Sequence, residues 1–256
     1  MDLEEQTKCQ QTQRQVEELE QMAKLHPLVS ELLETEQLLE DCGNAFMPKF
    51  KELAAKYKHF RRIRPDGSCF YRGFCYALVE HLVLNSLTEE AAKLKLRCQT
   101  AKEELVKLGY SSLTIEDFEE TFTNVLDELV INGSGTAQDV YSKFNDEALS
   151  NYFVVFMRLM VSSYIQSHVE DYKGLITTSP KEWCQNEVEP VQREADSIHV
   201  SVIALATGFS ILVENCQLSG DRLSNLVFPG SANETTPEAA ISIKMLYKPG
   251  HYDLLY

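Results

Sequence analysis

Residues 61–82 have the sequence RRIRPDGSCFYRGFCYALVEHL, in which a turn leads into a helix. Pro65, Asp66 and Gly67 are turn-forming residues, and an apolar stripe at helical spacing follows them. The stripe predicts a buried helix face that begins near Gly67. With Asp66 as the cap of this helix, Cys69 lies in the first helical turn.

Cys69 is therefore a candidate nucleophile. Unpaired amides and a partial positive charge at a helix N-terminus favour an anion, and the thiolate is the nucleophilic form of cysteine. The amides of the preceding turn could also stabilise a developing oxyanion. Position alone favours Cys69 as a small buried hydrophobe, because most intracellular cysteines are unreactive. A nearby general base decides between the two interpretations.

The C-terminal segment HYDLLY, residues 251–256, offers such a base. Residues two apart on a strand point to the same side, so His251 and Asp253 share a face. The carboxylate can then orient the imidazole and stabilise the imidazolium. His199, which precedes an apolar segment, is the alternative base. The remaining histidines suit surface or packing roles: His26, His59, His81 and His168.

The rest of the chain predicts one α/β domain that is mostly helical with a small sheet. Helices are expected over 48–58 and 152–166 from apolar periodicity, and over 114–131, where Thr114 and Asp117 resemble a capping box. Ser179, Pro180 and Glu182 predict the start of another helix. Strands are expected at 209–214 and 241–247, and Lys248-Pro249-Gly250 predicts a hairpin turn into the last strand.

Residues 1–41 are predicted to form an amphipathic helical arm before a catalytic domain over 42–256. Val16, Leu19 and Met22, and then Val29, Leu32 and Leu33, have helical spacing, and Pro27 divides the arm into two pieces. A frayed polar terminus and a partner-binding helix fit this composition equally well.

Composition excludes several classes of protein. Among 256 residues, 24 Lys and Arg oppose 39 Asp and Glu, and the net charge of −15 disfavours nucleic acid and anionic membranes as partners. Seven cysteines without a CxxC pair suggest neither a disulfide framework nor a metal site. The N-terminus has no apolar stretch typical of a signal peptide. We expect a cytoplasmic protein, with the nucleus as a further location.

Four segments carry a resemblance to a known family: RPDGSCFYRGF at 64–74, HPLVSELLE at 26–34, CQNEVEP at 184–190 and YKPGHYDLLY at 247–256. Together they resemble the otubain branch of the ovarian-tumour-domain (OTU) deubiquitinases. The resemblance implies a papain-like cysteine protease fold of the OTU type that hydrolyses isopeptide bonds at the ubiquitin C-terminus. It implies no metal and no organic cofactor.

The resemblance also implies roles for individual residues. Cys69 would be the nucleophile, His251 the general base and Asp253 the group that orients it, while the backbone of Asp66 would help to form the oxyanion hole. Two positions depart from the otubain pattern, because Ser68 replaces the usual Asn and Gly73 the usual Ala. Gly73 either loosens its helix or lets another part of the backbone approach.

The expected partners are ubiquitin and polyubiquitin chains, with the protein itself a monomer. The resemblance suggests chain trimming with a preference for the linkage that signals degradation. The alternative is a non-catalytic inhibitor or adaptor, in which residues 5–33 bind ubiquitin and ubiquitin-conjugating enzymes.

Overall fold

The computed structural model describes residues 24–40, 43, 46–217, 220, 222–229 and 242–256. Within them, a six-stranded sheet has the order β1-β2-β6-β5-β3-β4, and only β3 and β5 pair in parallel. The strands are β1 (Leu33–Glu34), β2 (His59–Arg61), β3 (Ile211–Asn215), β4 (Ser224–Phe228), β5 (Ile243–Lys248) and β6 (His251–Leu255).

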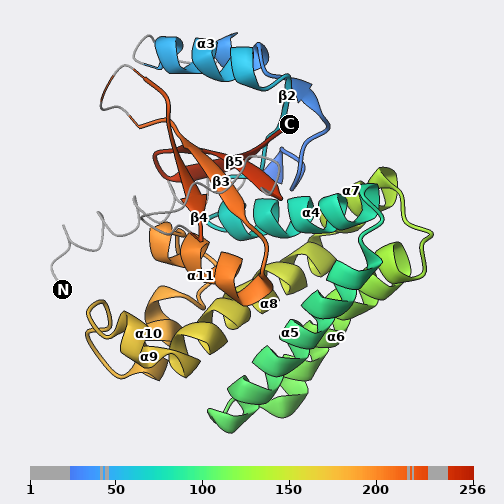
Figure 1. The fold of residues 1–256 in the computed structure, drawn as a ribbon, viewed down its shortest axis with the longest axis vertical. Coiled ribbons are helices and arrows are strands. Elements are labelled where there is room, and N and C mark those ends of the chain that lie inside the picture. Colours follow the sequence, from blue (N-terminus) through green and yellow to red (C-terminus); the bar gives the residue numbers. More distant parts are fainter. Residues whose placement is uncertain (1–23, 41–42, 44–45, 218–219, 221, 230–241) are drawn as a thin grey trace, which may run out of the picture.

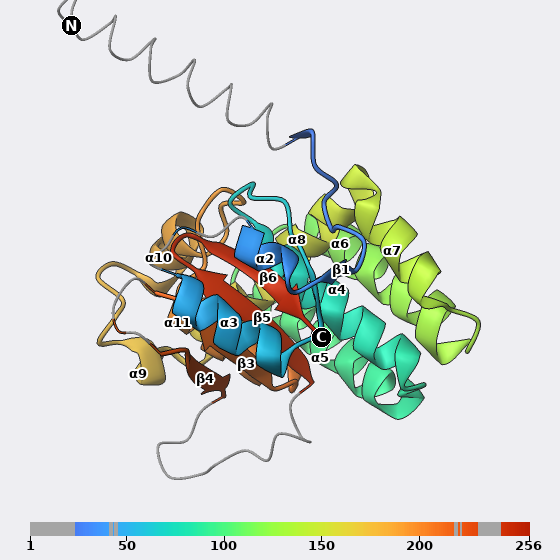
Figure 2. The same cartoon turned by 90° about the horizontal axis from the view of Figure 1, so that it is seen from above.

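Helices cover both faces of this sheet (Figures 1 and 2). The smaller layer holds α2 (Gln37–Glu40) and α3 (Met47–Lys56), and the larger layer begins with α4 (Cys69–Leu84). The remaining helical elements are α5 (Thr88–Lys107), α6 (Ser112–Leu126), the π-helical η1 (Asp127–Ile131), α7 (Ala137–Asn145), α8 (Glu147–Ser167), α9 (Val169–Tyr172), α10 (Pro180–Glu187) and α11 (Ser197–Thr207).

The alternation of side chains along the strands separates two hydrophobic cores. Met245 of β5 and Leu254 of β6 belong to the large core beneath α4, whereas their neighbours Leu246 and Leu255 pack with Phe50 of α3 in the small core. Successive strand residues point to opposite faces, so the hairpin supplies both cores at once. The α/β class with a mostly helical chain is confirmed.

Helix α8 passes through the large core and confirms the buried helix predicted over 152–166. Its length and apolar composition would suffice to cross a bilayer. It packs instead against α4, α5, α6 and α11, which explains why its side chains are apolar on nearly every side. Figure 1 shows it crossing the helical layer below α4.

The hairpin at the C-terminus forms as predicted. Strands β5 and β6 pair with Lys248 opposite His251, and Gly250 in the turn has a φ of +75°. Such a φ favours glycine because a side chain would clash with its own backbone. Residues 230–241, which connect β4 to β5, lie outside the described residues.

The helical arm is wrong in its second piece, and most of its first piece, residues 1–23, lies outside the described residues. Val29 forms a β-bridge with Ile63, and Leu33 pairs with Phe60 as part of β1. Three apolar residues at helical spacing are weak evidence for a helix. Burial of Val29 in the main core determines the conformation of this segment instead. Residues 28–40 thus pack onto the sheet of the larger domain.

Two predicted helix starts also need correction. Helix α6 begins at Ser112 with Ser111 as its N-cap, and no capping box forms at Thr114, whose hydroxyl instead donates to Ser111 Oγ. Helix α4 begins at Cys69, so its N-cap residue is Ser68 and not Asp66. At α10 the prediction is confirmed, because Ser179 Oγ accepts the amide of Glu182.

Candidate active site

The turn before α4 places Cys69 at the first position of that helix. Gly67 has a φ of +77°, and a Cβ there would come within 2.9 Å of the backbone oxygen of Gln192. Only glycine fits both the angle and the space. The Asp66 carboxylate accepts the amide of Ser68 at 2.9 Å and pairs with Arg72 at 2.5 Å. The turn is therefore rigid on both sides of the glycine.

The free amides of this turn do not include that of Asp66, which the family resemblance implied. The amide of Asp66 donates to Arg64 O at 3.0 Å, so it is already engaged. Among the described residues, the amides of Gly67 and Cys69 have no acceptor. An oxyanion formed beside the Cys69 sulfur would therefore meet these two donors. Asp66 contributes through its carboxylate, which holds the loop.

Strand β6 brings His251 and Asp253 together on one face, as the alternation of the strand predicts. His251 Nε2 lies 2.9 Å from Asp253 Oδ1, which also accepts the amide of Ile63 at 3.0 Å. Lys248 Nζ lies 2.7 Å from Asp253 Oδ2. The carboxylate, which is 1% exposed, is thus fixed from three directions.

The charges of this pair follow from these contacts. Burial acts to lower the pKa of His251, but interactions with Asp253 and Cys69 outweigh it and raise that pKa to about 9. Burial acts to raise the pKa of Asp253, but the hydrogen bond from His251 and the charge of Lys248 lower it to about 2. At neutral pH the imidazole is therefore protonated and the carboxylate ionised.

The structure brings Cys69 and His251 into contact range. His251 Nδ1 is buried and has no well-aligned hydrogen bond among the described residues, yet the Cys69 sulfur is near enough to raise the pKa of His251. With Nε2 held by Asp253, Nδ1 is the nitrogen left to exchange a proton with the thiol.

His199, the alternative base, has a different task. It lies at the start of α11 and its Nδ1 forms a capping box with Asp196, while its Nε2 lies 3.1 Å from the backbone oxygen of Glu187. Both ring nitrogens are occupied, and the residue is buried. The structure therefore favours His251 as the base.

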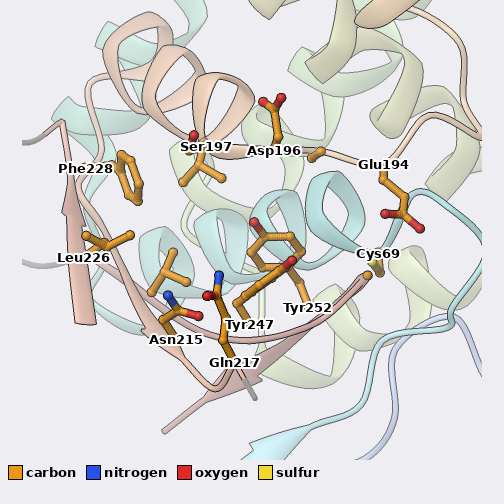
Figure 3. A pocket seen from close by; sticks show the side chains of 14 residues that line it. Cys69, Glu194, Asp196, Ser197, Asn215, Gln217, Leu226, Phe228, Tyr247 and Tyr252 are labelled. Carbon is orange, nitrogen blue, oxygen red and sulfur yellow. The ribbon is translucent and has the colours of Figure 1, made fainter. Parts of the chain in front are cut away.

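Two hollows are lined by residues of this site. The first, of about 290 Å³, has Cys69 at one end and Leu226 and Phe228 of β4 at the other, with Tyr247 and Tyr252 between them (Figure 3). The second, of about 230 Å³, is lined by His251 and Asp253. Its lining includes three cations and the triad pair: Arg62, Arg64, Lys248, His251 and Asp253.

Three residues around the site have roles that the sequence did not predict. Lys248 holds Asp253, Ser68 Oγ donates to the backbone oxygen of Val191, and Arg158 reaches the catalytic turn from α8. A signal existed only for Arg158, which is a charged residue inside an otherwise apolar helix. Such a buried cation needs a specific set of partners.

Gly73, one of the two departures from the family pattern, makes room for side chains. A Cβ at this position would lie 3.2 Å from Ile63 Cγ1 and 3.2 Å from Met245 Cε. The absent side chain thus lets α4 pack closely on the sheet. The approach is by side chains rather than by another backbone segment.

A thiol at a helix N-terminus, beside an imidazole that a buried carboxylate orients, defines the class of cysteine hydrolases. The family model "Peptidase C65 Otubain" matches residues 21–256. Human ubiquitin thioesterase OTUB1 is 35% identical over 243 residues, which cover 93% of this chain and 86% of the relative. The otubain-like ubiquitin thioesterase of Caenorhabditis briggsae is 35% identical over 256 residues, which cover 95% and 85%.

Solved structures agree with the sequence comparisons. The structure of a ceOTUB1 ubiquitin aldehyde UBC13~Ub complex contains a chain that matches with a TM-score of 0.85 and 28% identity, over 95% of this chain and 98% of that one. This protein belongs to the otubain family, peptidase C65. It is accordingly a cysteine peptidase with the OTU-type fold.

Proposed function

We propose that this otubain-family deubiquitinase cleaves isopeptide bonds at the ubiquitin C-terminus with Cys69 as nucleophile, His251 as general base and Asp253 as the group that orients His251. The observation that carries this assignment is the Asp253–His251 pair at 2.9 Å, which lies near enough to Cys69 for the thiol to raise the pKa of His251. Family membership supports the reaction class.

The first step forms an acyl-enzyme. The Cys69 thiolate attacks the carbonyl carbon of the C-terminal residue of ubiquitin, and the amides of Gly67 and Cys69 stabilise the resulting oxyanion. His251 then gives its proton to the leaving lysine amine as the carbon–nitrogen bond breaks. Ubiquitin remains attached to Cys69 as a thioester.

The second step releases ubiquitin. Water attacks the thioester carbonyl, His251 takes its proton, and the Cys69 sulfur leaves as a thiolate. The thiolate and the imidazolium are thereby restored as a pair. Asp253 stays ionised throughout, because its low pKa leaves it without a proton to exchange.

The two hollows suit the two sides of the scissile bond. The hollow that ends at Cys69 is lined by both apolar and polar side chains, which suits an extended tail that leads to the attacked carbonyl. The hollow lined by His251 is our candidate for the side of the leaving amine, because His251 gives that amine its proton.

Labelling with an activity probe tests the nucleophile. Ubiquitin that carries a thiol-reactive group at its C-terminus should add one ubiquitin mass to the protein, and Cys69→Ala should abolish the adduct. Cys75→Ala is the matched control, since Cys75 lies in the same helix but is fully buried. An adduct that persists in Cys69→Ala would refute the assignment.

We also propose that the enzyme trims chains and prefers the linkage that signals degradation. The resemblance of the catalytic segments to otubains supports this preference. A panel of diubiquitins that covers all linkages, digested at equal concentration and followed by gel densitometry, measures it directly. Equal rates across the panel would contradict the preference.

A second candidate function is the binding of ubiquitin-conjugating enzymes. Two observations favour it: similar chains were solved with ubiquitin aldehyde and UBC13~Ub, and with ubiquitin aldehyde and UBCH5B~Ub. We propose that residues 5–33 contribute to such an interaction, in which ubiquitin chain synthesis is inhibited without cleavage. Cys69→Ala should then still inhibit chain synthesis.

The truncation that tests this second function must respect the fold. A deletion of residues 1–40 would remove Val29 and Leu38, which belong to the two cores, so it would confuse lost binding with lost stability. A deletion of residues 1–24 avoids this. It should weaken inhibition of chain synthesis while Cys69 still reacts with the probe. Full inhibition by the truncated chain would reject the role of the arm.

A further inference from the structure

Arg158 lies at the centre of a hydrogen-bond network beneath the catalytic turn. It is 0% exposed and extends from the middle of α8. Its Nη1 donates to Val188 O at 2.9 Å, and its Nη2 donates to Gly67 O at 3.1 Å. The same Nη2 also lies 3.0 Å from Val191 O and 2.8 Å from Arg193 O.

These contacts join two separate segments. Gly67 belongs to the turn that holds Cys69, while the other three carbonyls belong to the segment 188–193. That segment leads directly to Glu194 and Asp196, which line the hollow that ends at Cys69. Ser68 Oγ adds a bond to Val191 O across the same junction. The Arg158 side chain thus connects the turn that holds Cys69 to the segment that leads to the lining of the hollow.

The charge of Arg158 has no carboxylate partner among the described residues. Its hydrogen bonds go to backbone carbonyls, and its guanidinium lies 4.4 Å from the ring centroid of Tyr71. A buried cation usually pairs with an anion. Burial lowers the pKa of Arg158, and the groups that oppose this are Tyr71, Asp66 and Cys69. Cys69 is therefore within electrostatic range of the guanidinium.

We propose that Arg158 is a positioning residue for the hydrolysis reaction: it fixes the catalytic turn against segment 188–193, and its buried charge favours the thiolate of Cys69. A planar fork is needed for the first task, since carbonyls from two segments must be reached at once. A positive charge is needed for the second. The proposal rests on Cys69 as the nucleophile of the proposed function.

Other charged groups also surround Cys69, and the test must hold them constant. They are His251 and Asp253 on β6, Lys248 on β5, Asp66 in the turn, Arg72 on α4, and Glu194 and Asp196 before α11. Variants confined to Arg158 leave all of these in place.

Two variants separate geometry from charge. Arg158→Lys keeps the charge but loses the planar fork, and Arg158→Gln keeps a side-chain donor but loses the charge. For each folded variant, the rate of Cys69 alkylation by iodoacetamide is measured against pH, with Cys69 identified by peptide mass spectrometry. The kcat for a fluorogenic ubiquitin substrate and the thermal midpoint are recorded alongside.

We expect Arg158→Gln to move the midpoint of the alkylation profile to higher pH, because loss of the buried positive charge disfavours the thiolate. Arg158→Lys should keep the wild-type midpoint and lose about tenfold in kcat, because the turn is no longer held. Arg97→Gln, which also removes an arginine that donates to backbone carbonyls, should change neither readout.

Several outcomes would overturn the proposal. An unshifted alkylation midpoint in Arg158→Gln removes the electrostatic role, and an undiminished kcat in Arg158→Lys removes the positioning role. If Arg158→Gln does not fold, Arg158→Lys decides; if neither folds, Arg158 serves stability alone and the proposal fails. Hydrolysis that survives in Cys69→Ala would reject the proposed function. This result is separate from the test of Arg158, because the alkylation of Cys69 is measured in the wild type and in the Arg158 variants.

Discussion

The protonation of His251 links the residues of the site to the rate of the reaction. Its pKa of about 9 means that the imidazolium persists through neutral pH and is lost as pH rises through that value. Because the leaving amine needs a proton from His251, kcat/KM should fall along an alkaline limb near pH 9. The pH at which this limb falls belongs to the coupled pair of thiol and imidazole and not to His251 alone.

Asp253→Asn should move this alkaline limb to lower pH. The substitution removes the negative charge that raises the pKa of His251, and the expected displacement is about one pH unit or more, with a lower plateau. Stopped assays with a fluorogenic ubiquitin substrate between pH 5 and about 10 measure the limb. An unmoved limb in Asp253→Asn would show that the carboxylate does not set the protonation of His251.

Lys248 should matter for the rate despite being partly exposed. Its side chain is 28% exposed and its ammonium holds the second oxygen of Asp253, so Lys248→Met should lower kcat/KM about threefold to tenfold. Lys248→Arg should restore most of the rate. Lys244→Met, on the same strand but in a different hollow, is the control and should behave as wild type. A Lys248→Met enzyme with full activity would mean that Ile63 and His251 alone fix the carboxylate.

At the scale of elements, the packing of α4 on the sheet explains an unusual glycine. Ala in place of Gly73 would gain up to about 1 kcal/mol in helix propensity. Its Cβ would also press on Ile63 and Met245 at 3.2 Å, and overpacking of a core costs about 1 to 3 kcal/mol. The added Cβ would therefore disturb Ile63, whose amide donates a hydrogen bond to the carboxylate of Asp253.

We therefore expect Gly73→Ala to lower the free energy of unfolding by about 1 kcal/mol and to reduce activity. Urea denaturation measures the first effect. Adding Met245→Leu, which removes the Cε atom, should recover part of the loss. A Gly73→Ala protein that is more stable than wild type would show that helix propensity outweighs packing here.

At the scale of the whole molecule, the segment before the first helices is part of the catalytic domain. Val29 is 0% exposed, exchanges two hydrogen bonds with Asn145 at 3.1 Å, and bridges to Ile63. Strand β1 also covers the edge of β2. Loss of this segment would therefore expose both core and sheet edge.

A protein that lacks residues 1–34 should be less stable than one that lacks residues 1–24 by about 2 to 4 kcal/mol. The difference comes from the buried Val29 and from the lost pairing with β2. Urea unfolding of the two truncated chains, followed by tryptophan fluorescence and far-UV circular dichroism, measures it. Equal midpoints would show that residues 25–34 add nothing to the fold.

Local patterns were sufficient for a large part of the fold and the site. The periodic stripe predicted α4 and α8, the alternation of HYDLLY predicted that His251 and Asp253 share a face, and Lys-Pro-Gly predicted the hairpin. Each of these depends on residues within about one turn or one strand of each other, so the backbone periods of 3.6 and 2 are enough. Cys69, His251 and Asp253 were candidates on the same local evidence, and the resemblance to otubains supplied their expected roles.

The remaining features depend on partners far apart in the chain. Ile63 and Asp253 are 190 positions apart, and Arg158 and Gly67 are 91 positions apart, yet each pair is hydrogen-bonded. Pairing with Ile63 and Phe60 turned residues 29–34 from an expected helix into extended chain. Propensity is worth only tenths of a kcal/mol per residue, so burial and strand pairing override it. The packing of the layers therefore determines which distant residues become partners.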